Sequence, residues 1–204
     1  MDRKVLIRKI IVYALYILLL TSFQVTFPGV ISFRGQVADI MFVFVVMTGY
    51  FFGFADGAVV GLITGLFRDY FAGPAFIGLD GKTARTVGIG MLVMFLAAAV
   101  GSSFFTRRMH RNIPFAFLAT AACTLIYKIS GHIIAFMWTA ATSDRSYGLT
   151  VSSLLTESIL PQLLLNLLAT IPIIFLLRFA GPYRKGINPA ADREEIGGNS
   201  WLTI

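Results

Sequence analysis

Long apolar runs separated by short polar breaks dominate the chain. A helix needs about 20 apolar residues to cross a bilayer, and the pattern predicts six such helices, at residues 10–30, 37–54, 57–71, 84–105, 113–140 and 151–179. The third run is short and follows the second almost without a loop, so it is either one arm of a tight hairpin or a segment that does not fully cross. We expect one all-α membrane domain over residues 1–180. A polar tail over residues 181–204, rich in Gly and Pro, is expected to be mostly disordered.

Composition and charge agree with this pattern. The chain is 57% hydrophobic and only 13% charged, against about 25% charged in a soluble domain, which excludes an ordinary soluble fold. The net charge of +7 comes from basic residues that flank the apolar runs. Placing both termini in the cytoplasm puts most of these residues on the cytoplasmic side, as the positive-inside rule requires. We therefore expect the lipid bilayer, and no nucleic acid, as the partner of the basic residues.

A glycine ladder is the strongest local pattern. Glycine recurs every fourth position across the second and third runs, at Gly49, Gly53, Gly57, Gly61 and Gly65. Four residues make about one helical turn, so these positions share a face where two backbones can approach closely. The ladder predicts either packing within the bundle or a docking face for another membrane protein.

Acidic residues stand near the ends of the predicted helices. Asp39 precedes the second run and is suited to a helix N-terminus. Asp56 lies in the turn before the third run and is expected to cap the third helix. Asp69 closes the third run, where the helix dipole disfavours a carboxylate. We therefore expect a specific role for Asp69.

A second set of polar residues lies within the last two runs. Lys128 is the deepest charge, and His132 follows four residues later on the same helical face. Glu157 and Gln162 enter from the same side on the last run, so Lys128 is expected to contact one of them. This intramembrane polar cluster is interpreted either as a packing device or as a proton relay, substrate site or partner contact.

No constellation of catalytic residues emerges. The chain has no G-x-S-x-G elbow and no nucleophile with a nearby base, and its two histidines and one cysteine lack metal-site spacing. We expect a protein that is not an enzyme and that carries no cofactor.

The segment over residues 38–78 resembles the bacterial rod shape-determining MreD family. In that family a Pro-Asp pair opens an apolar helix, spaced glycines follow, and a Gly-Leu-x-x-Asp sequence and a later Gly-Leu pair end the pattern. Here Ala38-Asp39 stands at the Pro-Asp position, with alanine for the usual proline, and Gly57, Gly61 and Gly65 stand in the glycine series. Gly65 to Asp69 matches the helix ending, and Gly78-Leu79 matches the later pair.

The resemblance implies a multi-pass subunit of the cell-elongation machinery in the bacterial inner membrane, with both termini cytoplasmic. Its implied partners are an MreC-like bitopic protein, MreB-like filaments, a RodA-type glycosyltransferase and a class B penicillin-binding protein, which together direct lateral peptidoglycan synthesis and rod shape. The family is also similar in architecture to the six-helix S components of energy-coupling-factor transporters. That likeness supplies the alternative, a subunit that binds a vitamin-like molecule near Lys128.

Overall fold

The structure is a computed structural model, and it describes residues 3–26, 32–72, 75–77, 83–85, 88–104, 112–142 and 151–183. Six main helices carry the described fold: α1 (Arg3–Thr26), α2 (Ile40–Phe52), α3 (Phe54–Ala72), α4 (Ile89–Phe104), α5 (Ile113–Thr142) and α7 (Leu160–Ala180). A short helix, α6 (Val151–Ser153), and a π-helical segment, η2 (Leu154–Ile159), lead into α7. Two small antiparallel hairpins pair β1 (Ser32–Phe33) with β2 (Gln36–Val37) and β3 (Ala75–Ile77) with β4 (Thr83–Arg85).

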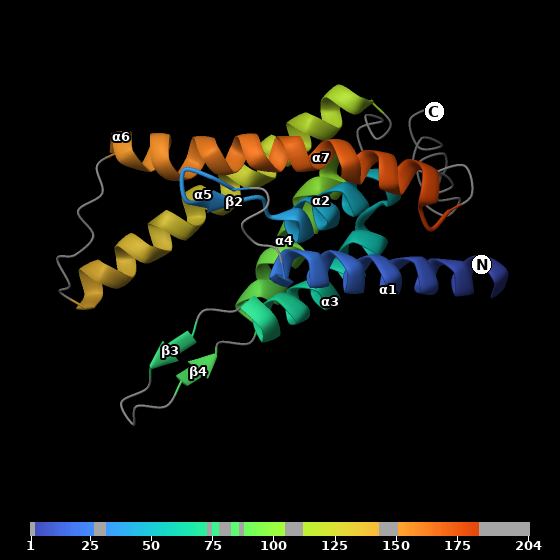
Figure 1. Ribbon diagram of the computed structural model, residues 1–204, viewed down its shortest axis with the longest axis horizontal. Helices are drawn as coiled ribbons and strands as arrows, with labels where there is room; N and C mark the ends of the chain where they lie inside the picture. The colour runs from blue at the N-terminus through green and yellow to red at the C-terminus, as the bar shows by residue number, and fades with distance from the viewer. Residues whose placement is uncertain are drawn as a thin grey trace, which may run out of the picture.

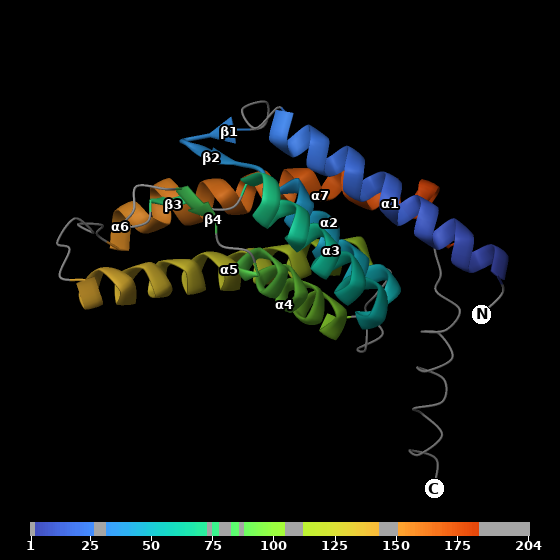
Figure 2. The same cartoon turned by 90° about the horizontal axis from the view of Figure 1, so that it is seen from below.

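Helix α2 lies at the centre of the bundle (Figures 1 and 2). It contacts each of the other five main helices, and all of its residues except Ile40 and Phe51 are buried. A helix that is apolar on every side belongs in a protein interior or in a membrane, and here it forms the core. The first turn of α1 and the last turn of α7 lie at the same end of the molecule (Figure 1).

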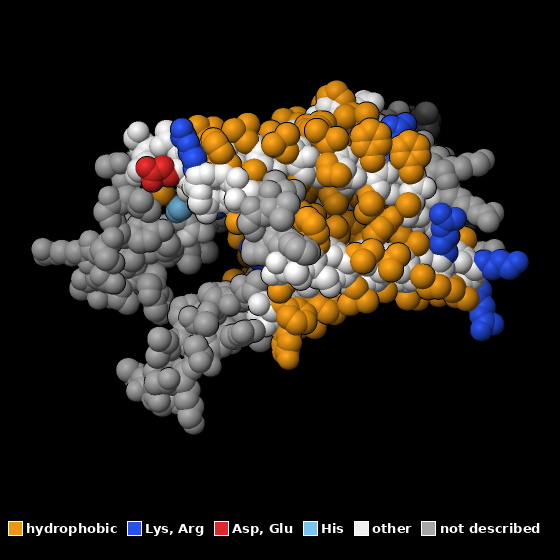
Figure 3. Space-filling view, in the orientation of Figure 1, with side chains coloured by type: hydrophobic (Ala, Val, Ile, Leu, Met, Phe, Trp, Pro, Cys, Tyr) orange, Lys and Arg blue, Asp and Glu red, His pale blue; other side chains and the backbone are white. Residues whose placement is uncertain are grey.

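All six predicted apolar runs contain helix, and three helical segments are long and apolar enough to cross a membrane. These are α1, residues Ile113–Ile133 of α5, and Leu154–Ala180. Helices α2 and α4 have only 13 and 16 residues, about 20 and 24 Å at 1.5 Å per residue, against a hydrocarbon core of about 30 Å. Figure 3 shows a band of apolar side chains over α1 and α7 with charged side chains at both ends, which fits an integral membrane protein.

Backbone chemistry sets several helix ends. Gly53 alone separates α2 from α3, with φ +91°, in the left-handed region that favours glycine. The second and third runs are therefore joined by a tight turn, one of the two predicted alternatives. Pro161, the second residue of α7, has no N–H to donate. The turn before it is wider than an α-helical turn, and the Leu160 N–H bonds Leu155 O, five residues back.

Candidate functional site

The glycine ladder packs α3 against α2 and α4. A Cβ at Gly57 would lie 2.7 Å from Gly49 Cα, and one at Gly61 would lie 2.8 Å from Met94 O. A Cβ at Gly65 would lie 2.5 Å from Met91 Cα. The structure therefore corrects the docking-face interpretation for these positions, because this chain's own helices occupy that face. Gly53 has a different role, since it forms the turn between α2 and α3.

Asp69 holds the beginning of α4. Its side chain is 2% exposed and accepts hydrogen bonds from the backbone N–H groups of Gly88 at 2.6 Å, Gly90 at 2.8 Å and Met91 at 3.4 Å. These donors precede or open α4 and have no partner within that helix. A carboxylate that is unfavourable at the C-terminus of α3 is favourable at the N-terminus of α4. The role expected for Asp69 is therefore a cap supplied by one helix to the next.

A cluster of buried and half-buried polar side chains supports the extended backbone that leads into α2. We call Gln24, Asp39, Thr124, Gln162 and Asn166 the Asn166 cluster. Four hydrogen bonds of 2.9 Å join its side chains to that backbone: Gln24 Nε2 to Ala38 O, Ile40 N to Gln24 Oε1, Gln162 Nε2 to Val37 O, and Asp39 N to Asn166 Oδ1. Asn166 also donates to Thr124 Oγ1 at 3.1 Å and accepts from Gln162 at 3.1 Å. The cluster therefore satisfies peptide groups of residues 37–40, where β2 ends and α2 begins.

Asp39 caps α2 and carries an ion pair. Its Oδ1 accepts the Phe42 N–H at 3.0 Å, which confirms the predicted position at a helix N-terminus. Its Oδ2 accepts from Arg68 Nη1 at 2.7 Å, and Arg68 Nη2 donates to Tyr127 Oη at 2.9 Å. The Asp39 and Arg68 side chains are only 13% and 26% exposed. The Asp39 carboxylate thus links the start of α2 to the end of α3 and, through Arg68, to the middle of α5.

The predicted intramembrane cluster of Lys128, His132, Glu157 and Gln162 is only partly assembled. Lys128 Nζ donates to Gln36 Oε1 at 2.8 Å, so the expected contact with Glu157 or Gln162 is wrong. His132 Nε2 lies 3.0 Å from Ser158 Oγ, while Glu157 is exposed. The β1–β2 hairpin, which helical spacing cannot anticipate, supplies the Lys128 partner.

A second polar cluster lies at the other end of α2. We call Lys9, Tyr13, Asp56 and Tyr183 the Asp56 cluster. Asp56 is 2% exposed and accepts from Lys9, from Tyr13 Oη at 2.8 Å and from Tyr183 Oη at 2.6 Å. Asp56 was expected to cap α3, but it joins α1, α3 and the segment after α7 instead. Burial, together with the hydrogen bond to Asp56, raises the pKa of Tyr183 above its ordinary value.

The packed domain therefore extends past residue 180, the predicted boundary. Tyr183 is 5% exposed, and Arg8 Nη2 donates to Gly181 O at 3.2 Å. Tyr16 Oη also donates to Ala180 O at 2.7 Å. The rest of the predicted tail, residues 184–204, and the Gly78-Leu79 pair lie outside the described residues.

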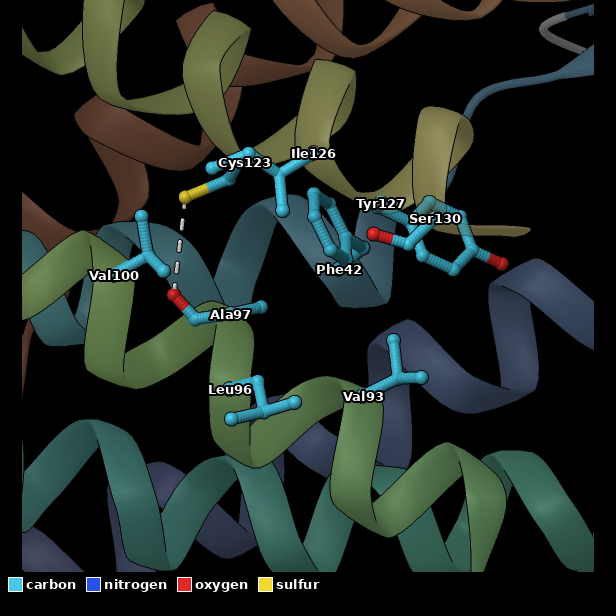
Figure 4. Close-up of a pocket in the computed structure, with 9 residues that line it drawn as sticks. All are labelled: Phe42, Val93, Leu96, Ala97, Val100, Cys123, Ile126, Tyr127 and Ser130. Carbon is cyan, nitrogen blue, oxygen red and sulfur yellow. Dashed lines mark hydrogen bonds between the residues drawn. The ribbon is translucent and has the colours of Figure 1, made fainter. Parts of the chain in front are cut away.

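A small apolar pocket opens between α4 and α5 (Figure 4). Its volume is about 90 Å³, and none of the residues predicted for a site lines it. Cys123 lies on its wall with the thiol 3.8 Å from Ala97 O, and the ring of Phe42 lies near Tyr127. With no charged group in its lining, the pocket fits an apolar group and offers nothing to orient a polar substrate.

Several residues that build these clusters are missing from the predicted set. Gln24, Asn166 and Tyr127 are polar residues inside apolar runs, a signal that the sequence does carry. Tyr13 and Tyr183 gave no such signal, because tyrosine is common where apolar segments meet water. Only the fold shows that both tyrosines reach Asp56.

No family model, curated protein or solved structure matches the chain. The residues and their geometry therefore carry the argument for function.

Proposed function

We propose that this chain is a non-enzymatic membrane subunit of the bacterial cell-elongation machinery. The observation that carries the proposal is that the residues of the resemblance act as one structural unit. Asp39 caps α2, the glycines pack α3 on α2 and α4, and Asp69 caps α4. A pattern of this kind encodes a particular helix arrangement, which is what a scaffold subunit needs.

The expected partners are those of the resemblance: an MreC-like bitopic protein, a RodA-type glycosyltransferase, a class B penicillin-binding protein and, directly or through them, MreB-like filaments. Partner helices are expected on exposed apolar faces, since the ladder is covered by this chain. Leu92 and Leu96 on α4 are 58% and 51% exposed, and Leu164 and Leu168 on α7 are 53% and 59% exposed. Large apolar residues of this kind face lipid or another helix.

The alternative, a transport subunit with a polar ligand site near Lys128, gains no specific support. The amides of Gln162 and Asn166 bond this chain's own backbone and each other. Lys128 bonds Gln36. A ligand that used these groups would have to displace the hydrogen bonds that hold the start of α2, and each unpaired buried group costs about 1–3 kcal/mol.

The test is a tagged pull-down at native expression in a mild detergent, read by quantitative mass spectrometry. An unrelated tagged multi-pass protein provides the background. Enrichment of an MreC-like protein with a RodA-type enzyme or a class B penicillin-binding protein supports the proposal. Enrichment of a membrane coupling protein with two ATPases overturns it in favour of transport.

The variants for this experiment should be exposed ones. Gly61→Leu and Gly65→Leu would force α3 away from α4, so a loss of partners would report misfolding. The pair Leu92→Ala with Leu96→Ala on α4 can be compared with Leu164→Ala and Leu168→Ala on α7. Loss of a partner from one pair alone, at unchanged protein abundance, assigns that partner to one face.

A further inference from the structure

An apolar groove runs between α1 and α3. Its volume is about 450 Å³. Tyr13 and Ile17 of α1 and Val60 of α3 are buried, at 7%, 4% and 1% exposure, and line its floor. Along α1 the lining extends from Leu6 to Leu18, about 18 Å at the rise of an α-helix. This is a long, narrow hollow rather than a site for a compact ligand.

The groove exists because one position on α1 is small. Ile10, Ala14 and Leu18 follow each other at four-residue spacing and form one ridge of α1. Ala14 interrupts this ridge between two large side chains. Val59, Ile63 and Phe67 form the facing ridge on α3 with the same spacing. Val59 and Ile63 are 56% and 41% exposed, so the hollow is open along its length.

Basic charge gathers at one end of this groove. Helix α1 carries Arg3, Lys4, Arg8 and Lys9 in its first two turns and no acidic residue within its bounds. Lys9 lines the groove and bonds Asp56. Arg3 is exposed and lies three residues before Leu6 and seven before Ile10, on the groove face of α1. Lys4 and Arg8 lie on other faces, and Arg8 turns to Gly181.

We infer that this groove binds one acyl chain of an anionic phospholipid whose phosphate lies beside Arg3. The apolar lining fits the chain, and its length runs along the helix as a lipid tail does. Among the described residues, the acid beside this end of the groove is Asp56, which is paired with Lys9, and Arg3 is the exposed charge that faces the headgroup. Basic residues at a membrane surface attract anionic lipids in this way. This inference does not depend on the proposed role in cell elongation.

The experiment uses the full chain in nanodiscs that contain equal amounts of palmitoyl-oleoyl phosphatidylglycerol and phosphatidylcholine. After extraction with a mild detergent, native mass spectrometry measures which lipid stays bound. We expect one phosphatidylglycerol in preference to phosphatidylcholine. Arg3→Gln should lower that preference about fivefold, the weight of roughly 1 kcal/mol for one basic residue near an anionic surface. The control Lys4→Gln removes the same charge from another face and should keep the preference.

A second pair of variants tests the groove itself. Ala14→Phe fills the gap in the α1 ridge and should abolish the retained lipid. Leu15→Phe places the same ring at the next residue, 52% exposed and outside the groove, and should retain it. Both should melt within a few degrees of the parent in neutral detergent, which separates loss of lipid from loss of fold.

Two outcomes would overturn the inference. One is equal retention of phosphatidylglycerol and phosphatidylcholine by the parent protein. The other is that Ala14→Phe keeps its lipid while a protein partner disappears from membranes purified without added lipid. That second result would assign the groove to a helix of the partner.

Discussion

Replacing Gly65 with alanine should destabilise the protein although it adds a single methyl group. The new Cβ would lie 2.5 Å from Met91 Cα, 2.6 Å from Gly90 O and 2.7 Å from Met91 N. Ordinary contacts between such atoms are about 3.5–4.0 Å, so α3 and α4 must separate by roughly 1 Å. All three atoms belong to backbone, which cannot rotate away as the end of a side chain would.

The cost of Gly65→Ala can be built from its parts. Overpacking of a close contact costs about 1–3 kcal/mol. The separation also stretches the hydrogen bonds of Asp69, one turn later, and loss of a helix cap costs about 0.5–2 kcal/mol. Alanine returns about 1 kcal/mol through its higher helix propensity. The net loss is about 2 kcal/mol, roughly a 30-fold rise in the unfolded fraction.

Cys123 provides the assay. It is the only cysteine, it is 3% exposed, and its thiol lies against Ala97 of α4. A maleimide therefore labels the native protein only after the bundle opens. Where opening is fast compared with labelling, the labelling rate follows the open population, and Gly65→Ala should react about 30 times faster than the parent.

Gly131 is the matched control, because a Cβ there would meet nothing within 4 Å. Gly131→Ala makes the same change inside α5, and we expect it to stabilise the protein by about 0.5–1 kcal/mol and to slow labelling. The reasoning is refuted if Gly65→Ala and Gly131→Ala label at the same rate. That result would mean that α3 and α4 are not in backbone contact at Gly65.

Three further outcomes follow from the polar clusters. Asp69→Ala should lower the free energy of unfolding by about 2–3 kcal/mol in the same labelling assay, because it leaves the N–H groups of Gly88 and Gly90 without an acceptor. Asp69→Asn should lower it less, because one side-chain oxygen remains. Asn166→Leu should lower the melting temperature by several degrees, since the Asp39 N–H loses its partner, whereas Leu168→Ala on the exposed face of α7 should change it little. The pKa of Tyr183 is raised in the folded state above the ordinary value of about 10. The stability it contributes is therefore full below pH about 10 and declines above it, as the tyrosine of the unfolded chain ionises. Thermal melts across this pH range should show a shallower decline in Tyr183→Phe.

The apolar pattern predicts where the helices are better than where they begin. Each run contains a helix, but α4 begins at Ile89 instead of residue 84. Gly88 has φ +114°, and residues 83–85 pair in β4, so the helix cannot start earlier. Helix α1 instead begins at Arg3, seven residues before its apolar run. Basic residues are good helix formers, and hydropathy alone does not count them.

The sequence is a poorer guide to which polar groups meet. Asp39 as a helix cap is local and predictable, because the residue and its N–H partner are three positions apart. Asp69 meets N–H groups 19 to 22 positions away, and nothing in the spacing shows that α3 and α4 lie together at that level. Lys128 meets Gln36, 92 positions away. Helical periodicity places residues on a face, but tertiary packing decides what that face contacts.

The two polar clusters lie at the two ends of the short central helix. Along α1, Lys9 marks the level of the Asp56 cluster and Gln24 marks the level of the Asn166 cluster. The 15 residues between them span about 22 Å, close to the roughly 20 Å length of α2 and less than the hydrocarbon thickness of about 30 Å. The distance between the two clusters is therefore shorter than the hydrocarbon core of a bilayer.

The start of this short, buried helix is supported by polar side chains from its neighbours. Gln24, Gln162 and Asn166 bond the peptides before α2, while the single-residue turn at Gly53 leaves almost no backbone to satisfy at the other end. The three amide side chains in otherwise apolar helices thus bond the peptides before α2, and these bonds account for their presence without a bound ligand. By the same reasoning, Arg3, which is exposed and has no charged partner within the described part of the chain, is a better candidate for contact with molecules outside it.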